Sequence, residues 1–254
     1  MLSKNQAKQV RALHKKKVRR EQGLFLVEGE KVVAELLASD WTIDRLFATP
    51  EFSHTYQELI QTAKVEVVTC DSAELTSIST LVTNSAALAV VKVPESAQTR
   101  VDTQGWILAL DNINDPGNLG SILRIADWYG IQQVVCSPTT AELFNPKVIT
   151  ASKGSFLRVA VSYQPLHEFL TQLPANTAVL GAYLDGESVH ELSGCTNGGV
   201  VLLGSEAQGI SSELAALVNK RITIPAFGAA ESLNVGVAAA VICDNLVRIG
   251  GRSR

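Results

Sequence analysis

The chain has 254 residues, of which 46% are hydrophobic and 19% charged, and it carries a formal net charge of −3. This composition excludes a disordered chain and supports a substantial buried core, and the length suits one large or two ordinary domains. No uninterrupted apolar run reaches the ~18 residues needed to span a bilayer, and no apolar stretch of signal-peptide type follows the basic N-terminus. Both observations favour a cytoplasmic protein without membrane contact.

The positive charges are concentrated at the N-terminus. Eight lysines and arginines precede the first acidic residue, Glu21, although the chain as a whole is acidic. This asymmetry indicates a phosphate-facing patch, and a solvated helix face is the ordinary alternative. The four cysteines include no CxxC pair, and no cluster of His, Cys and carboxylates has metal-ligand spacing. The sequence therefore predicts reduced thiols and no metal site.

Residues 1–93 have the pattern of a small α/β domain. In chain order we expect a basic helix from Ser3 to about Lys17, a strand at 24–29, a helix at 30–39, a strand at 43–49, a helix near 56–62, a strand at 65–70, a short helix at 72–78 capped by Asp71, and a strand at 86–93. Residues 94–105 are polar, contain a proline and show no periodicity, which is typical of a linker.

Residues 106–254 alternate between apolar strands and helices. The expected strands are 106–111, 132–137, 156–161, 178–184, 199–205 and 221–226, and the expected helices are 120–129, 146–151, 166–173, 212–219 and 233–249. Near-continuous apolar strands separated by helices predict an α/β domain with a mostly parallel sheet covered by helices on both faces.

Three polar loops of this second domain connect strands to helices. They are DNINDPGNLGS (111–121), LLGSEAQGIS (202–211) and IPAFGAAESLNVG (224–236). Such loops meet at the carboxyl edge of a parallel sheet, where α/β proteins bind ligands. The first loop lacks the GxGxxG pattern that a pyrophosphate requires, which argues against NAD and FAD.

In this order and at this spacing, the three loops resemble the motifs of the SpoU (TrmH) family of RNA ribose 2′-O-methyltransferases, within the SPOUT superfamily. The resemblance covers about residues 106–250. It implies S-adenosyl-L-methionine (AdoMet) as the cofactor, RNA as a partner, a homodimer, and a trefoil knot formed by the final loops.

The N-terminal part has a resemblance of its own. The basic helix followed by FLVEGEKVVAELL (25–37) is similar to the substrate-binding domain that often precedes this catalytic domain, a domain with a fold like that of ribosomal protein L30e. Where such domains often show Pro-Gln-Gly before the last strand, this chain has Thr83, Asn84 and Ser85, which weakens any transfer of detailed RNA contacts.

The resemblance assigns roles to individual residues. The catalytic residues would be Asn118, Arg124, Glu206, Ser232 and Asn234, and the AdoMet-binding residues Ala182, Leu203, Gly204, Ile224 and Leu233. The RNA-binding residues would be Lys15, Lys16, Lys17, Arg19, Arg20 and Lys147, with Ser152 as a further phosphate contact.

Plainer roles exist for several of these residues. Glu206 could cap a helix, and Ser232 suits the N-cap of the helix that follows it. A lone arginine in a helix is normally a surface residue, but the apolar neighbours of Arg124 favour a position facing a cleft. In the family, the matching arginine is proposed to activate the ribose 2′-hydroxyl. Since arginine seldom gives up a proton, Arg124 acts either as an unusual base assisted by RNA phosphate or as a clamp that stabilises the developing alkoxide.

The favoured function is an AdoMet-dependent ribose 2′-O-methyltransferase acting on structured RNA, with ribosomal RNA favoured over transfer RNA. The alternatives are a transfer RNA 2′-O-methyltransferase and a non-catalytic RNA-binding or ribosome-assembly factor on the same fold. The intact set of catalytic residues argues against the non-catalytic alternative.

Overall fold

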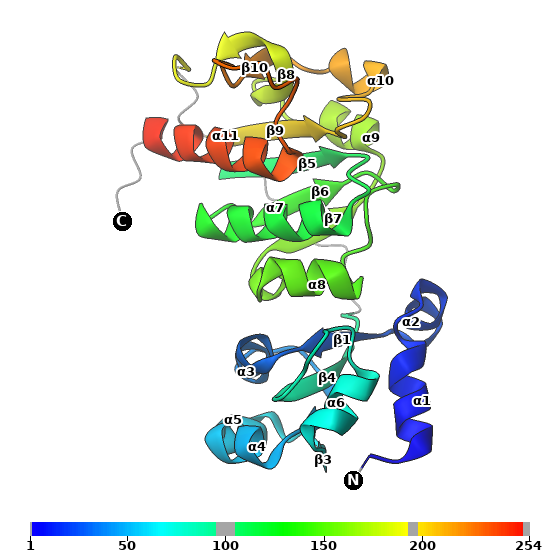
Figure 1. The fold of residues 1–254 in the computed structure, drawn as a ribbon. Coiled ribbons are helices and arrows are strands. Elements are labelled where there is room, and N and C mark those ends of the chain that lie inside the picture. Colours follow the sequence, from blue (N-terminus) through cyan, green and yellow to red (C-terminus); the bar gives the residue numbers. More distant parts are fainter. Residues whose placement is uncertain (1, 95–104, 193–197, 251–254) are drawn as a thin grey trace. The chain divides into compact units, whose positions relative to one another are not determined.

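The computed structural model describes residues 2–94, 105–192 and 198–250 (Figure 1). The chain divides into two compact units, the first comprising Met1–Ser96 with Phe144–Leu157, and the second comprising Ala97–Leu143 with Arg158–Arg254. Nearly all of the expected linker at 94–105 lies outside the described residues, as does Cys195. Within the described ranges, no helix is long and apolar enough to cross a membrane.

The first unit is built on a four-stranded sheet with the order β1-β4-β2-β3. β4 is antiparallel to both of its neighbours, whereas β2 and β3 are parallel. The strands are β1 (Leu24–Glu28), β2 (Ile43–Ala48), β3 (Val67–Thr69) and β4 (Ala87–Lys92). The helices are α1 (Lys4–Ala12), α2 (Lys16–Gln22), α3 (Glu30–Leu37), α4 (Pro50–Thr55), α5 (Gln57–Ala63), α6 (Ser72–Ile78) and α8 (Pro146–Ser152), followed by a 3₁₀ turn, η1 (Ser155–Leu157).

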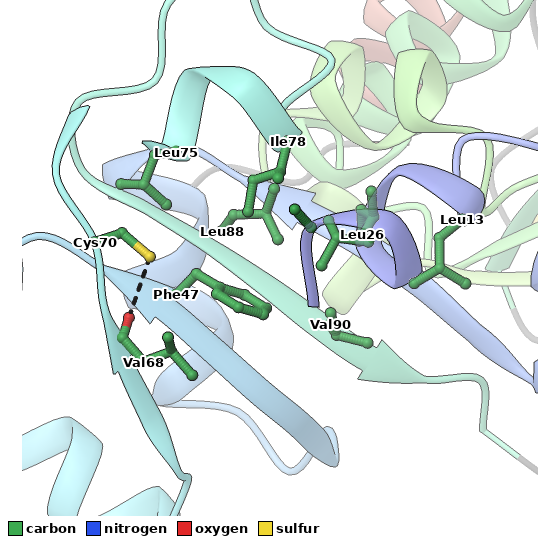
Figure 2. Packing of buried hydrophobic residues seen from close by; sticks show 11 residues of the cluster. Leu13, Leu26, Phe47, Val68, Cys70, Leu75, Ile78, Leu88 and Val90 are labelled. Carbon is green, nitrogen blue, oxygen red and sulfur yellow. Dashed lines mark hydrogen bonds between the residues drawn. The ribbon is translucent and has the colours of Figure 1, made fainter. Parts of the chain in front are cut away.

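Figure 2 shows the core on one side of this sheet, where side chains of β1, β2 and β4 meet those of α6 and of the N-terminal helices. Phe47 and Leu88 lie at its centre and are fully buried. The thiol of Cys70 donates to the carbonyl of Val68 at 3.6 Å. Burial, with a smaller contribution from the nearby Glu74 carboxylate, raises the pKa of the Cys70 thiol to about 11. Cys70 therefore serves as a small apolar side chain in the core.

The expected single basic helix is divided into α1 and α2. The reason is Arg19, which is only 3% exposed. Its Nη1 donates to the carbonyl oxygens of Leu13 at 3.0 Å and His14 at 2.9 Å. These carbonyls follow the end of α1 and would otherwise lack partners, so the buried guanidinium stabilises the turn between the two helices.

The segment Phe144–Leu157 belongs to the first unit, although it follows β6 of the second in the chain. The ring of Phe144 lies 4.5 Å from that of Phe25 in β1, and the ring of Phe156 lies 5.6 Å from that of Trp41. Phe25 and Phe156 are both buried. Because Phe156 packs into the first unit, the strand expected at 156–161 begins only at Ala160.

The second unit is a six-stranded sheet with the order β10-β8-β9-β5-β6-β7, in which every described pair is parallel. Its strands are β5 (Gly105–Asp111), β6 (Gln133–Cys136), β7 (Ala160–Tyr163), β8 (Val179–Ser188), β9 (Gly198–Gly204) and β10 (Lys220–Thr223). Its helices are α7 (Pro116–Trp128), α9 (Leu166–Thr171), α10 (Ser212–Ala215) and α11 (Val235–Ile249). The predicted parallel sheet flanked by helices is confirmed.

The helices lie on both faces of this sheet (Figure 1). α9 and α10 pack onto alternate residues of the central strands, including Ile107, Ala109, Val200 and Leu202. α7 and α11 pack against each other and contact β6 and β9. Since successive strand residues point to opposite faces, Leu108 and Leu203, both buried, point toward the other layer.

Candidate active site

The first and second motif loops leave the sheet side by side. β5 and β9 are parallel neighbours, and their last residues, Asp111 and Gly204, are partners in register. The loops that follow therefore start from the same edge of the sheet. The third loop follows β10 and ends at α11, whose packing against α7 returns it to the first loop.

The first loop is held rigidly where it enters α7. Asn112 adopts a left-handed conformation with φ of 59°, and its main-chain N–H donates to Ser137 Oγ at 2.9 Å. The Asp115 carboxylate is the N-cap of α7 and accepts from the N–H of Asn118 at 2.9 Å. Pro116 occupies the first helical position, which suits its fixed φ. The helix expected from Gly120 therefore starts a turn earlier, and an Asp-Pro pair is the sequence signal for this start.

The second loop is a tight turn. The N–H of Gly209 donates to the carbonyl of Ser205 at 2.8 Å. The N–H of Gln208 donates to Ser205 Oγ at 3.2 Å. The chain folds back so closely that a Cβ on Gly204 would lie 2.1 Å from the carbonyl carbon of Gly209 and 2.2 Å from the nitrogen of Ile210. Gly204 is therefore required for the turn itself.

The third loop ends at Asn234, which is the N-cap of α11. Its Oδ1 accepts from the N–H groups of Gly236 at 3.0 Å and Val237 at 3.3 Å. The sequence suggested Ser232 as the N-cap, but the structure gives this role to Asn234, because the helix begins at Val235. Ser232 is exposed.

Three of the five expected catalytic residues meet in one hydrogen-bonded cluster. Asn234 Nδ2 donates to Glu206 Oε1 and to Asn118 Oδ1, both at 2.8 Å. Asn118 Nδ2 lies 3.4 Å from Glu206 Oε1, and the N–H of Val235 lies at the same distance from that oxygen. Each residue comes from a different loop. The Glu206 carboxylate thus sits at the positive end of α11, where a negative charge is stabilised by about 0.3 to 1 kcal/mol.

The other two expected catalytic residues lie outside this cluster. Arg124 is exposed and lies six residues after Asn118, in the middle of α7 rather than near its end. Over that distance a helix rises about 9 Å. Within the described ranges, neither Arg124 nor Ser232 forms a side-chain hydrogen bond or an ion pair. Arg124 is therefore exposed rather than enclosed by the cleft that its apolar neighbours in the sequence suggested.

The residues expected to bind the cofactor line the strand ends and the third loop. Leu203 is buried, Ala182 and Ile224 are half-buried, and Leu233 is 46% exposed. Phe227, in the same loop, is 95% exposed. Leu233, left partly open to water, directly precedes Asn234 of the cluster, and an apolar side chain next to a carboxylate and two amides suits AdoMet, which has an apolar adenine and a positively charged sulfonium. No group of His, Cys, Asp and Glu that could hold a metal ion occurs in the described part of the chain.

The residues expected to bind RNA differ in accessibility. Lys15, Lys16, Lys17, Arg20 and Lys147 are exposed. Lys17 forms an exposed i,i+4 pair with Glu21 at 3.7 Å. Arg19 and Ser152 are buried, and Ser152 Oγ donates to the carbonyl of Ile149 at 2.9 Å. These two are therefore removed from the set of RNA contacts.

Comparisons with known proteins agree with this geometry. A family model described as the SpoU rRNA Methylase family matches residues 105–244, and one described as the MRM3-like substrate binding domain matches residues 4–89. The 23S rRNA (guanosine(2553)-2′-O)-methyltransferase RlmP of Bacillus subtilis is 29% identical over 96% of this chain and 97% of its own.

Two solved structures also match almost the whole chain. One, described as a putative RNA methyltransferase of the TrmH family from Porphyromonas gingivalis, is 36% identical with a TM-score of 0.82 and covers 98% of this chain and 99% of its own. The other, the SpoU methyltransferase AviRb from Streptomyces viridochromogenes in complex with AdoMet, is 26% identical with a TM-score of 0.84 and covers 98% of this chain and 100% of its own.

Proposed function

The chain belongs to the SpoU rRNA methylase family, and we propose that it methylates a ribose 2′-hydroxyl in ribosomal RNA. It is an AdoMet-dependent RNA 2′-O-methyltransferase, with the SpoU catalytic domain preceded by a substrate-binding domain. The observation that carries this proposal is the cluster of Asn118, Glu206 and Asn234, which joins all three motif loops at one edge of the sheet.

Ribosomal RNA is favoured by the extent of the matches. RlmP and a 23S rRNA (uridine(2479)-2′-O)-methyltransferase of Streptomyces viridochromogenes each align with more than nine-tenths of this chain, including both domains. The tRNA (guanosine(18)-2′-O)-methyltransferase of Thermus thermophilus aligns with only 52% of it. A match that includes the N-terminal domain carries information about the substrate that a match to the catalytic domain alone lacks.

Different side chains of this protein would bind the cofactor, orient the site and lie at the reaction centre. AdoMet, when bound, supplies an electrophilic methyl group on a sulfonium. Ile224 and Leu233 would cover its adenine, and Glu206 holds the amides of Asn118 and Asn234 in fixed orientations. Ser232 would lie at the methyl-transfer centre, beside the N-cap of α11.

Arg124 is assigned an electrostatic role. It is exposed, and within the described ranges its side chain forms no hydrogen bond or ion pair. A charged guanidinium can hold an RNA phosphate through two parallel hydrogen bonds and stabilise negative charge developing on the attacking oxygen. Of the two roles left open by the sequence, we propose the clamp.

The homodimer, the trefoil knot and the cytoplasmic location implied by the family resemblance are part of the same proposal. A dimer is supported by the apolar side chains that the paired helices α7 and α11 expose, among them Trp128 at 71% and Val237 at 50%. The knot rests on the family to which the chain belongs.

A methylation assay on RNA from a strain lacking this gene tests the proposal. With AdoMet, we expect the protein to methylate a 2′-hydroxyl in ribosomal RNA, and to leave transfer RNA from the same cells unmodified. The reaction should proceed in EDTA, because the proposed chemistry uses no metal. AdoMet binding without methylation of either RNA would favour the non-catalytic alternative, and loss of activity in EDTA with recovery on adding Mg²⁺ would contradict the metal-free site.

A further inference from the structure

Asp111 is an acidic residue at the site that the motif cluster does not include. It is the last residue of β5 and is only 9% exposed. Its Oδ2 accepts a hydrogen bond from the main-chain N–H of Ser211 at 2.8 Å, across a separation of 100 residues. A buried carboxylate bonded to the backbone of a distant segment fixes where that segment lies.

Ser211 is the point at which the second motif loop ends. The loop starts at Gly204, which is paired in register with Asp111 itself. It then turns sharply at Ser205 and passes Ile210 before α10 begins at Ser212. Asp111 therefore lies at both ends of this turn: it is the register partner of Gly204 at the start, and its side chain accepts from Ser211 at the end.

Glu206 lies within the turn held in this way. Its Oε1 accepts from Asn234 at 2.8 Å and lies 3.4 Å from the Asn118 amide nitrogen. A movement of the turn by about an ångström would take the 2.8 Å contact with Asn234 outside the usual N–H···O range of about 2.7 to 3.2 Å, and would separate Glu206 further from Asn118. The position of Glu206 thus depends on a bond that Asp111 makes at the other end of the turn.

We propose that Asp111 is a positioning residue for methyl transfer, which acts by holding the Ser211 N–H so that Glu206 reaches Asn118 and Asn234. This role rests on the proposed function. The required chemistry is an acceptor at this place rather than a negative charge, since the partner is a neutral peptide group. Asparagine, whose amide oxygen can also accept, should therefore replace it, and alanine should not.

The test compares Asp111→Ala with Asp111→Asn in the full-length protein. We expect Asp111→Ala to lower kcat by tenfold or more, with the KM for RNA and the Kd for AdoMet within about fivefold of the parent. Asp111→Asn should keep kcat within about threefold. In an Asp111→Ala/Glu206→Ala double variant, the effect of Asp111→Ala should shrink to less than twofold, because Glu206→Ala removes the acceptor that Asp111 positions, and residues that act through one another are not additive.

Asn219→Ala is the matched control. The Asn219 side chain also accepts from a distant main-chain N–H, that of Val179 at 2.7 Å, but at the amino end of β8. Its loss should lower the melting temperature and leave kcat unchanged. Hydrogen–deuterium exchange of residues 205–211 should rise in Asp111→Ala and stay unchanged in Asn219→Ala.

Three outcomes would overturn the role of Asp111: unchanged exchange in the turn, an unchanged kcat for folded Asp111→Ala, or equal losses in the parent and Glu206→Ala backgrounds. An Asp111→Asn variant as inactive as Asp111→Ala would also overturn it. A parent protein that shows the Asp111-dependent exchange yet methylates no RNA would instead refute the proposed function and leave the structural link intact.

Discussion

Arg124 and Asn118 lie on the same helix but in different surroundings. Asn118 is fixed by the Asp115 cap and by Asn234, whereas Arg124 is exposed and has no partner in the described residues. A side chain held in advance suits a role in organising the loops. A free guanidinium suits a ligand that arrives with its own negative charge, as RNA does.

Arg124→Ala should therefore remove activity without removing the cofactor. We expect kcat to fall by a hundredfold or more, since one lost stabiliser of developing charge costs about 3 to 4 kcal/mol. The Kd for AdoMet should stay within about threefold, because the expected cofactor walls come from the other loops. Arg124→Lys keeps the positive charge but lacks the paired N–H donors, so its kcat should lie between those of the parent and of Arg124→Ala. Full activity of purified Arg124→Ala would refute the clamp.

Gly204 is a second residue where the structure changes the prediction. The family resemblance assigns Gly204 to AdoMet binding alone. A Cβ at this position would collide with the backbone of Gly209 and Ile210, so any side chain here disrupts the turn before it affects the cofactor site. Even Gly204→Ala should thus weaken both AdoMet binding and activity by tenfold or more. Gly209→Ala has open space around its Cβ and bears only the strain of a φ of 66°. It should have a much smaller effect, measured by calorimetric titration, and equal losses in the two variants would contradict this account.

At the scale of elements, α2 and its N-cap residue carry the exposed cations Lys15, Lys16, Lys17 and Arg20. If these contact phosphates, replacing all four by glutamine should weaken RNA binding and flatten its salt dependence. Each lost contact should lower the slope of log affinity against log salt concentration by roughly 0.7 to 0.9.

Arg19→Gln is the matched control for this experiment. Because Arg19 is buried, its loss should lower the melting temperature and leave the slope of the remaining folded protein unchanged. Filter binding at several salt concentrations measures the slope. An unchanged slope in the variant with all four replacements would show that these side chains are solvated and do not contact RNA.

Most elements could be predicted from the sequence because their apolar periodicity is local. The strands β5, β6 and β9 and the helix α11 lie close to their expected ranges. Errors occurred where a distant contact decides the outcome. The basic helix is broken because Arg19 folds back onto Leu13 and His14, and the strand at 156–161 is shortened because Phe156 packs against Trp41. β10 stops at Thr223, before Pro225, which has no N–H for a sheet.

The residues of the candidate site also fall into those that could be identified from the sequence and one that could not. The family resemblance was enough to select Asn118, Glu206 and Asn234, which the structure brings together. It was not enough to find Asp111, whose partner Ser211 is 100 residues away and contributes only a backbone N–H. A main-chain donor has no sequence signature, so a contact of this kind is visible only in three dimensions.

At the scale of the whole molecule, the two units share the chain in an interleaved order. The first unit uses Phe144–Leu157, which is inserted between β6 and β7 of the second. Phe156→Ala should therefore destabilise the N-terminal unit by about 3 kcal/mol or more, the usual cost of emptying a buried aromatic site. Urea unfolding followed by the fluorescence of the nearby Trp41 measures this. Phe227→Ala removes the same side chain from an exposed position and should stay within about 0.5 kcal/mol. Equal midpoints for the two variants would show that the inserted segment does not support the first unit.

This interleaving also affects the order of events during synthesis. Domains generally fold as they leave the ribosome, the N-terminal one first, at roughly 5 to 20 residues per second. Here the rings of Phe25 and Trp41 have no cover until Phe144 and Phe156 have been made, by which time β5, α7 and β6 have already emerged. For several seconds the nascent N-terminal unit would present an open aromatic face, the kind of surface that chaperones bind. Its last segment would be made before the second and third motif loops, which follow Leu157 in the chain, so the N-terminal unit could close while the catalytic unit is still being synthesised.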